Sequence, residues 1–318
     1  MTARAESDEK YLLDIVARIL AEPDYSWQHR FPALLGDPGR DGKPRTLPVD
    51  GYFPRHRLIV EYWERQHSAP VGIMDEGESV SGVSRGHQRR LYDARRQAFA
   101  DAHGLRLVIL DYRGFETGHQ GRLRRDPARD EAIVAEALRF AGALDEPARE
   151  PVDMARYVEE ARQGCFICRL AQADPSLPPH QVVWRDSHAI AFLDRFPAAF
   201  GHTLVAPVRH AEQVTGEFTL NDYLSLQRVV HAVAEAVRLA LMPERVYVLS
   251  LGSQSLNAHV HWHIVPCPPG LPLEEQQTVL LERRSGAVRL SPEEGEALAR
   301  RLRERLPAWM RERATGVS

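Results

Sequence analysis

Three histidines at alternate positions near the end of the chain restrict the local fold more than any other stretch. They are His259, His261 and His263 in HVHWHIVP, and each is followed by an apolar residue. An alternation of period two is typical of a β-strand, so we expect the imidazoles on one face and the apolar side chains on the other. Crowded imidazoles lower one another's pKa by repulsion, and histidine fills an apolar core poorly. The stretch therefore predicts a site with a histidine nucleophile; the alternative is a structural or exposed histidine cluster.

A neutral imidazole attacks without a separate base when an acceptor holds its other ring nitrogen. The order His, apolar, His, apolar, His, apolar, apolar resembles the signature of the histidine triad (HIT) family, over roughly residues 160–285. The resemblance implies nucleotidyl transfer, in which His261 attacks the α-phosphorus of a nucleotide and the nucleotidyl-histidine is then hydrolysed or phosphorolysed. It also implies that the carbonyl of His259 orients His261. His263, on the same face, is placed to hydrogen-bond a phosphate oxygen or the leaving group.

Further positions of the second half match nucleotide-binding residues of the same family. Asp194, at the end of AFLD, matches the acid that accepts hydrogen bonds from ribose hydroxyls, although an Asp at a turn is also unexceptional. In GSQSLNAH the Gln254 and Ser255 pair lies one residue further from the triad than in many members. We expect these two side chains and Asn257 to bind phosphate; the alternative is a polar hairpin turn. No role is assigned to His202.

The cysteines Cys165 and Cys168 form a CxxC motif. The motif alone is ambiguous between zinc, thiol redox chemistry and two buried cysteines, because a cysteine pair is half a zinc site. The resemblance to zinc-containing HIT proteins implies that His210 and His259 complete it. A Cys₂His₂ set is closed and therefore structural, and zinc on His259 would fix the backbone beside His261.

The length of 318 residues is sufficient for two domains. A segment rich in Pro and charge at residues 142–153 predicts their boundary, which gives domains 1–146 and 147–318. Periodicity predicts the following elements. The helices are 8–21, 86–103, 130–144, 151–163, 221–241 and one capped by Ser291; the strands are 46–53, 57–63, 105–112, 181–185, 188–194, 202–207 and 244–253; the loops are 31–45 and 69–86.

The first half resembles restriction-endonuclease-like domains related to very-short-patch-repair endonucleases. The similar segments, within residues 45–115, are VDGYFPRHRLIVEYWERQH and YDARRQAFADAHGLRLVILDY. Asp50 and Glu61, on paired strands, would hold Mg²⁺ or Mn²⁺, with Asp93 nearby and His67 as acid or base. Many nucleases of this fold have a lysine where this chain has Trp63. The alternative is a solvated group of acids beside an arginine-rich helix, in a domain that binds without cleaving.

Composition limits the partners and the cellular compartment that we expect for this protein. A net charge of -3 excludes a basic surface over the whole protein but not a local nucleic-acid site. No apolar run approaches the ~18 residues of a membrane span, so we expect no membrane partner. Three cysteines do not make a secreted disulfide framework, and we expect a cytoplasmic protein.

These observations predict an α+β protein with an N-terminal restriction-endonuclease-like α/β core and a C-terminal HIT-like antiparallel sheet with helices. The leading function is a nucleotide hydrolase or nucleotidyltransferase acting on a nucleotide or dinucleotide, as a homodimer, with structural zinc. One alternative is a metal-dependent nuclease or nucleic-acid-binding protein whose HIT domain processes or senses nucleotides. Another is a nucleotide-binding module without activity that recruits partners.

Overall fold

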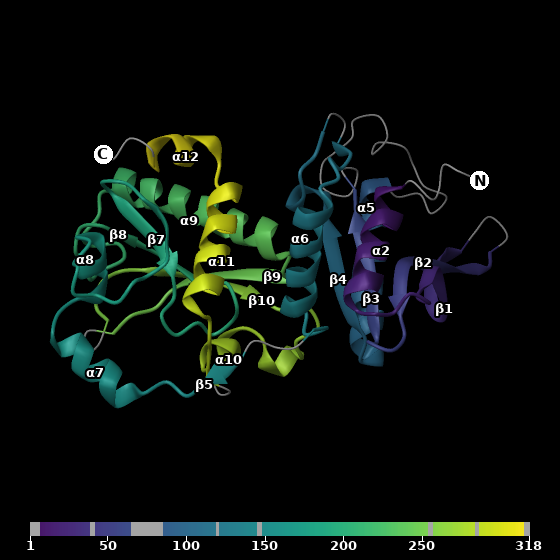
Figure 1. The fold of residues 1–318 in the computed structure, drawn as a ribbon, viewed down its shortest axis with the longest axis horizontal. Helices are drawn as coiled ribbons and strands as arrows, with labels where there is room; N and C mark the ends of the chain where they lie inside the picture. Colours follow the sequence, from purple (N-terminus) through teal and green to yellow (C-terminus); the bar gives the residue numbers. More distant parts are fainter. Residues whose placement is uncertain are drawn as a thin grey trace. The chain divides into compact units, whose positions relative to one another are not determined.

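The chain folds into two compact units, Met1–Glu146 and Pro147–Ser318, each with its own sheet (Figure 1). The computed structural model describes residues 7–38, 42–64, 85–118, 121–144, 148–253, 257–283 and 286–314. Most of the loop predicted at 69–86 lies outside these ranges.

The first unit contains a four-stranded mixed sheet. Its elements are α2 (Asp8–Ile19), β1 (Ser26–Pro38), β2 (Pro44–Phe53), β3 (Leu58–Trp63), α5 (Arg85–His103), β4 (Arg106–Asp111), η1 (Tyr112–Gly114) and α6 (Pro127–Phe140). The strands lie in the order β1–β2–β3–β4; β2 is antiparallel to both neighbours and β3 is parallel to β4.

Helices α5 and α2 cover opposite faces of this sheet. Phe99 of α5 belongs to the same apolar cluster as Ile59 of β3. A Cβ on Gly51 of β2 would lie 2.5 Å from the Cδ2 of Leu13 in α2, which places α2 on the other face. Glu61 of β3 lies on the same face as Ile59 and therefore faces α5, where Arg96 lies 3.4 Å from its carboxylate.

The loop predicted at residues 31–45 is wrong, because β1 extends to Pro38. The prolines and glycine of this segment argued against a strand. They are tolerated because β1 lies at the sheet edge and its register with β2 is irregular between Arg30 and Leu35 and between Leu35 and Pro38. Leu34, 2% exposed, anchors the segment in the core.

The second unit contains a five-stranded antiparallel sheet, which confirms an α+β fold with helices for this part of the chain. Its elements are β5 (Arg149–Glu150), α7 (Met154–Arg162), α8 (Phe166–Ala171), β6 (Val182–Arg185), β7 (Ala189–Leu193), β8 (Thr203–Pro207), α9 (Leu220–Leu241), β9 (Arg245–Ser250), β10 (Trp262–Cys267), η3 (Leu273–Glu275), α10 (Thr278–Leu281), β11 (Ala287–Val288), α11 (Pro292–Arg305) and α12 (Ala308–Ala314). The sheet order is β6–β7–β8–β10–β9, and β5 pairs with β11.

The two faces of this sheet have different neighbours. Helices α9 and α11 contact one face (Figure 1), where Val260, Trp262 and Ile264 join the main apolar cluster. The opposite face packs against α8 through a smaller cluster that includes Phe192 and Leu204. The alternation predicted for the triad segment is therefore confirmed for its apolar residues.

The start of the triad strand differs from the prediction, because β10 begins at Trp262 and not at His259. The backbone before it makes other hydrogen bonds: the Val260 N–H donates to the Ala211 carbonyl at 2.7 Å, and the Ser250 hydroxyl donates to the His261 carbonyl at 2.8 Å. His259 and His261 thus lie in an extended segment leading into the strand.

A tight turn precedes β8. Gly201 has φ +86°, and a Cβ at this position would lie 2.1 Å from the Cδ1 of Leu241 in α9. Glycine allows both the left-handed backbone and the close approach of the helix. The turn sets the direction in which the next residue, His202, enters the sheet.

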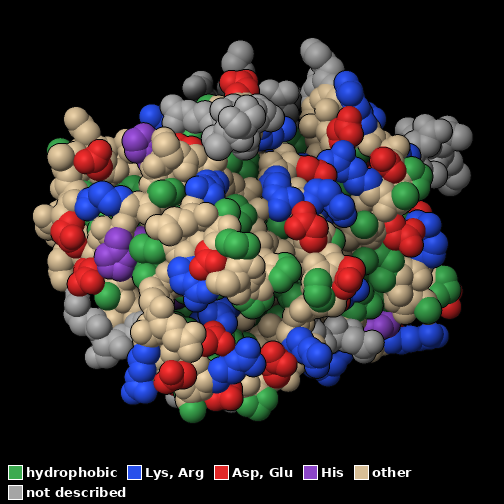
Figure 2. All heavy atoms as spheres, turned by 60° about the vertical axis from the view of Figure 1, so that its left-hand side comes forward, with side chains coloured by type: hydrophobic (Ala, Val, Ile, Leu, Met, Phe, Trp, Pro, Cys, Tyr) green, Lys and Arg blue, Asp and Glu red, His purple; other side chains and the backbone are tan. Residues whose placement is uncertain are grey.

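Figure 2 shows basic and acidic side chains interspersed over the face in view. Among the residues that the structure describes, none of the helices combines the length and the apolar character needed to cross a bilayer.

Candidate functional site

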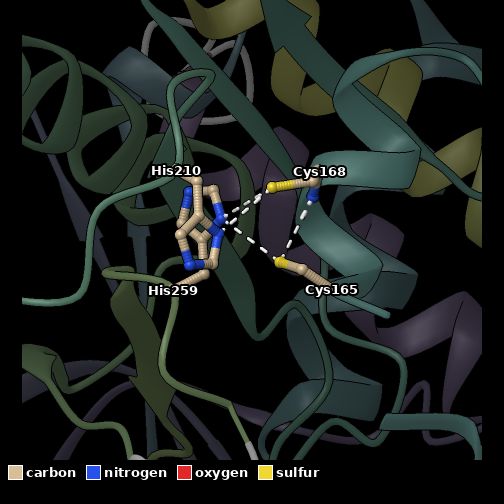
Figure 3. Close-up of side chains that lie close together, drawn as sticks. All are labelled: Cys165, Cys168, His210 and His259. Carbon is tan, nitrogen blue, oxygen red and sulfur yellow. Dashed lines mark hydrogen bonds between the residues drawn. The ribbon is translucent and has the colours of Figure 1, made fainter. Parts of the chain in front are cut away.

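Two cysteines and two histidines converge beside α8 (Figure 3). Cys165 caps the helix and Cys168 lies in its first turn, so both sulfurs emerge on the same side. The Cys165 Sγ lies 3.3 Å from the Nδ1 of His259, and the Cys168 Sγ lies 3.2 Å from the Nδ1 of His210 and 3.4 Å from that of His259. In a tetrahedral zinc site, a sulfur and a nitrogen ligand are about 3.5 Å apart. The four side chains therefore fit zinc in number, type and spacing.

The Nε2 atoms of His210 and His259, which point away from the sulfurs, also have polar partners. The Nε2 of His259 donates to the Pro207 carbonyl at 2.9 Å, and the Nε2 of His210 lies 3.3 Å from the Glu212 carboxylate. These partners direct each Nδ1 toward the sulfurs, as in protein metal sites. Burial raises the pKa of Cys168 to about 12 and lowers that of His259 to about 4. A bound cation would hold the cysteine as a thiolate, whereas the neutral imidazole is already the ligand form.

His261 has the geometry of a neutral nucleophile. Its Nδ1 lies 2.7 Å from the carbonyl oxygen of His259. Because a carbonyl only accepts hydrogen bonds, Nδ1 carries the proton and Nε2 keeps its lone pair. Burial lowers the pKa of His261, which favours the neutral ring. The predicted orienting carbonyl is thus in contact with the predicted nucleophile.

His263 lies beside His261, with their ring centroids 4.8 Å apart. Burial lowers the pKa of His263 to about 3, and the neighbouring His202 and His261 add to the shift. The low pKa values in the triad differ in cause from the predicted repulsion between the rings, because loss of solvent is the larger cause for all three histidines.

His261 lies between two cavities of about 420 and 850 Å³. Phe166 and Arg195 contribute to the smaller one, and His263 and Arg283 to the larger. Both volumes lie within the usual range of ligand pockets, about 300–1,000 Å³. Six residues line both cavities: Tyr157, Asp194, Phe196, Leu204, Asn257 and His261.

Two of the predicted nucleotide ligands lie at these cavities. The Asp194 carboxylate accepts hydrogen bonds from the Phe196 N–H at 2.9 Å and from the Arg283 guanidinium at 3.1 Å. The Oδ1 of Asn257 is buried and has no hydrogen-bond partner in the described part of the chain. Asn257 lines both cavities, so this oxygen is placed to accept a hydrogen bond from a bound molecule. Gln254 and Ser255 lie outside the described residues.

Sequence reasoning did not identify Tyr157 and Arg283. Tyr157 belongs to α7, which has no buried side chain; its ring contacts Phe196 with centroids 5.3 Å apart. Arg283 donates to the carboxylate of Asp194 from a segment far beyond the triad. Neither residue lies in a motif, and only the tertiary fold brings them to the cavities.

In the first unit, the predicted acids are in part brought together. The Asp50 N–H donates to the Glu61 carboxylate at 3.2 Å. Asp93 is linked to this pair through Arg96, which lies 3.4 Å from Glu61 and 3.1 Å from Asp93. Among the described residues, the clusters able to hold a metal do not include these acids, and His67 lies outside the described part. Arg96, from the arginine-rich helix α5, thus supplies a cation next to Glu61.

These acids give the first unit a pH-dependent stability. Burial raises the pKa of Glu61 to about 8, with the nearby Asp50 adding to the shift. Folding therefore favours the protonated form, so the stability from Glu61 is full below its ordinary pKa of 4.5 and is lost as the pH rises toward 8. We expect Glu61→Gln to stabilise this unit at pH 9 by on the order of 2 kcal/mol relative to the unsubstituted protein.

Hydrogen exchange of the β2 and β3 amides measures this effect in the first unit alone. The matched control is Glu64→Gln, which removes an exposed carboxylate at the end of the same strand segment. If the opening free energy depends on pH in the same way in the Glu61 variant and in the unsubstituted protein, ionisation of Glu61 costs the fold little free energy and the prediction is wrong.

Comparisons with known proteins identify the second unit. A profile of the HIT domain matches residues 177–269. An uncharacterised HIT-like protein of Mycoplasma genitalium is 36% identical over 109 residues, which cover 32% of this chain and 72% of that protein. The Hit protein of Bacillus subtilis is 34% identical over 109 residues, 33% of this chain and 71% of its own length. An adenosine 5'-monophosphoramidase of Schizosaccharomyces pombe is 29% identical over 108 residues, covering 33% and 75% of the two chains. Through its second unit, the chain belongs to the HIT family.

Proposed function

We propose that the protein is a nucleotide hydrolase or nucleotidyltransferase that acts at an α-phosphate through a covalent nucleotidyl intermediate on His261. One observation carries the proposal: the His259 carbonyl holds the Nδ1 proton of His261, which leaves the Nε2 lone pair available. The two adjoining cavities provide space for a nucleotide and its leaving group. The similarity to an adenosine 5'-monophosphoramidase supports a nucleotide substrate.

The reaction has two displacements at phosphorus. The Nε2 lone pair of His261 forms an N–P bond as the bond to the leaving group breaks, and the leaving group departs with that electron pair. The Nδ1 proton stays on the ring, where the His259 carbonyl stabilises the positive charge. Water, which gives up a proton to solvent, or another acceptor then attacks phosphorus; the N–P bond breaks and its electron pair returns to Nε2.

Other residues are assigned to binding. Asp194 would accept hydrogen bonds from ribose, while Asn257, together with Gln254 and Ser255, would bind the phosphate. Cys165, Cys168, His210 and His259 would hold a structural zinc ion, which takes no part in the chemistry and fixes the segment that carries the orienting carbonyl.

Intact-mass spectrometry after a rapid quench tests the proposal. The full chain is mixed with adenosine 5'-phosphoramidate or a diadenosine polyphosphate, and a nucleotidyl adduct is expected on the unsubstituted protein and not on His261→Ala. Saturable binding with neither product nor adduct would support the non-enzymatic alternative.

A second proposal concerns the first unit, where Asp50 and Glu61 lie side by side. We propose that residues 1–146 form a restriction-endonuclease-like domain that binds nucleic acid and uses Mg²⁺ or Mn²⁺ to cleave it. Many nucleases of this fold have a lysine at the position of Trp63, and Arg96, next to Glu61, would supply the missing positive charge. Incubation with each metal and several DNA and RNA forms, beside an Asp50→Asn, Glu61→Gln double variant, tests cleavage. Binding without cleavage would leave only the nucleic-acid-binding role.

The edge of the second sheet supports a homodimer. Strand β9 lies at the end of the sheet order, and Val248 and Leu251 beside it are 46% and 50% exposed. An unpaired edge with exposed apolar side chains is suited to pairing with a second chain. We propose that two copies associate through β9.

A further inference from the structure

A separate cavity of the second unit lies away from the catalytic groups. It has a volume of about 530 Å³ and is formed by the turn between β6 and β7, the segment after β8, the first half of α9 and Trp309 of α12. None of its lining residues lines either cavity at His261. Its volume falls within the usual range of ligand pockets, about 300–1,000 Å³. The proposed reaction has no use for this cavity.

Two arginines line the cavity, and each lies over an aromatic ring. The guanidinium carbon of Arg209 is 5.3 Å from the ring centroid of Phe218, and that of Arg228 is 5.4 Å from the ring centroid of Trp309. Trp309 in turn contacts the buried Trp184, with ring centroids 6.4 Å apart. A guanidinium that lies on an aromatic ring is held in place while the N–H groups at its edge remain available. The cavity therefore has two oriented cationic groups.

Neither guanidinium is neutralised by a carboxylate in the described part of the chain. Arg228 makes no hydrogen bond or ion pair there, and Arg209 donates only to the backbone carbonyl of Glu217. The carboxylate of Glu217 accepts hydrogen bonds from the backbone N–H groups of Glu212 and Gln213 instead. Both positive charges are thus available to a ligand.

Two acids also line the cavity, but other groups of the protein hold their carboxylates. The Oδ1 of Asp186 accepts hydrogen bonds from the N–H groups of His188 and Ala189 at 2.7 and 2.8 Å. The Oδ2 of Asp222 accepts one from the Thr219 hydroxyl at 2.7 Å. The donors that remain for a ligand are the two guanidinium groups and three further side chains that line the cavity: Ser187, His188 and Ser225.

A more apolar cavity of about 730 Å³ adjoins this one, because Arg228 and Trp309 line both. Leu224, which is 50% exposed, and Leu239 contribute to its walls. The Nε2 of Gln227, another lining residue, is buried and has no hydrogen-bond partner among the described residues. A molecule that extends from one cavity into the other would meet cations at one end and mainly apolar side chains at the other.

We propose that the two cavities form a binding site for a phosphate monoester with an apolar or aromatic body. The phosphate group binds Arg209 and Arg228, and the body lies against Leu224, Leu239 and Trp309. A phosphate monoester has three terminal oxygens that accept charge-assisted hydrogen bonds, whereas a carboxylate has two and carries less charge. The ligand lies apart from His261 and is not the substrate of the proposed reaction.

Nuclear magnetic resonance of the full chain with ¹⁵N-labelled tryptophan tests the site with benzyl phosphate as the probe. The indole signal of Trp309, assigned from the Trp309→Phe variant, is expected to shift saturably during the titration. An unchanged Trp309 signal would overturn the proposal. So would a change confined to Trp262, which lies between two triad histidines, because it would mean binding at the catalytic site. The measurement needs no turnover.

The Arg209→Gln, Arg228→Gln double variant is expected to bind benzyl phosphate about tenfold more weakly or worse, because it loses charge-assisted hydrogen bonds. The matched control is Arg139→Gln, Arg300→Gln, which removes two exposed arginines of α6 and α11 and changes the net charge equally. This control should bind normally. Equal weakening in the two double variants would mean a general attraction between charges and would reject the proposal.

Three further probes separate the contributions of the phosphate and the body. Inorganic phosphate is expected to bind about tenfold more weakly than benzyl phosphate or worse, since it leaves the apolar cavity unfilled. Phenylacetate, which has the same ring and a carboxylate, and benzyl alcohol, which has no charge, should also bind more weakly. If inorganic phosphate binds as tightly as benzyl phosphate, the body is not recognised. If phenylacetate or benzyl alcohol does, the phosphate is not recognised, and either result contradicts the proposal.

Discussion

Replacement of His261 by alanine is expected to reduce turnover by at least about 10⁴-fold, because it removes the atom that forms the covalent intermediate. The ring lies at the junction of the two cavities and donates a single hydrogen bond, to the His259 carbonyl. Its loss should therefore leave the fold intact. Steady-state hydrolysis of a dinucleoside polyphosphate or an AMP ester measures the effect, and circular dichroism with thermal unfolding checks the fold.

The control for this variant is His231→Ala, which removes an exposed histidine of α9. It should keep full activity and thus exclude a general effect of losing an imidazole from this unit. A folded His261→Ala protein that turns over at the normal rate would show that another group attacks phosphorus.

Loss of the metal is expected to have the second largest effect. Cys168→Ala removes a ligand whose sulfur lies within 3.4 Å of both histidine nitrogens. The variant should lose zinc, and the free energy of unfolding of the second unit should fall by on the order of 4 kcal/mol, since metal binding adds directly to folding stability. Metal content by mass spectrometry and urea unfolding, with and without a chelator, measure both changes.

Cys267→Ala is the matched control, because Cys267 is buried in β10 and lies outside the Cys/His cluster. It should retain zinc and lose only about 1 kcal/mol through the smaller side chain. If protein made in zinc-sufficient medium contains no zinc, or if Cys168→Ala keeps it, the assignment of the cluster is wrong.

The same loss of metal is expected to lower activity even where the protein stays folded. His259 contributes its ring to the cluster and its carbonyl to the hydrogen bond that orients His261. Release of the ring would let this carbonyl move. Turnover measured at low temperature, where the Cys168→Ala protein remains native, separates this effect from unfolding.

Much of the second unit follows from local sequence. Residue alternation predicted which side of the triad segment is apolar, and Val260, Trp262 and Ile264 confirm it. The CxxC spacing and the family resemblance together named four side chains that do converge. The start of β10 was not predictable from the alternation. The residues before it, Val260 and His261, form hydrogen bonds with Ala211 and with the Ser250 side chain and not with a paired strand.

Other features depend on tertiary structure, and the local residue pattern does not predict them. The strand β1 contains prolines that are acceptable only because it lies at a sheet edge. The hydrogen bond between Asp50 and Glu61 follows from the predicted pairing of their strands, whereas the approach of Arg96 depends on how α5 packs. His202 accepts a hydrogen bond from the backbone N–H of Ala198, four residues away, and no residue pattern encodes this contact.

The turn at Gly201 affects how a deep mutational scan of this protein should be interpreted. Any side chain at this position would collide with Leu241, and the backbone is left-handed, so nearly every substitution should be depleted as strongly as substitutions of His261. An activity screen alone would therefore score a residue without functional groups as if it took part in the chemistry. Pairing the screen with a measure of cellular abundance separates the two positions, because only Gly201 variants would disappear from the soluble fraction.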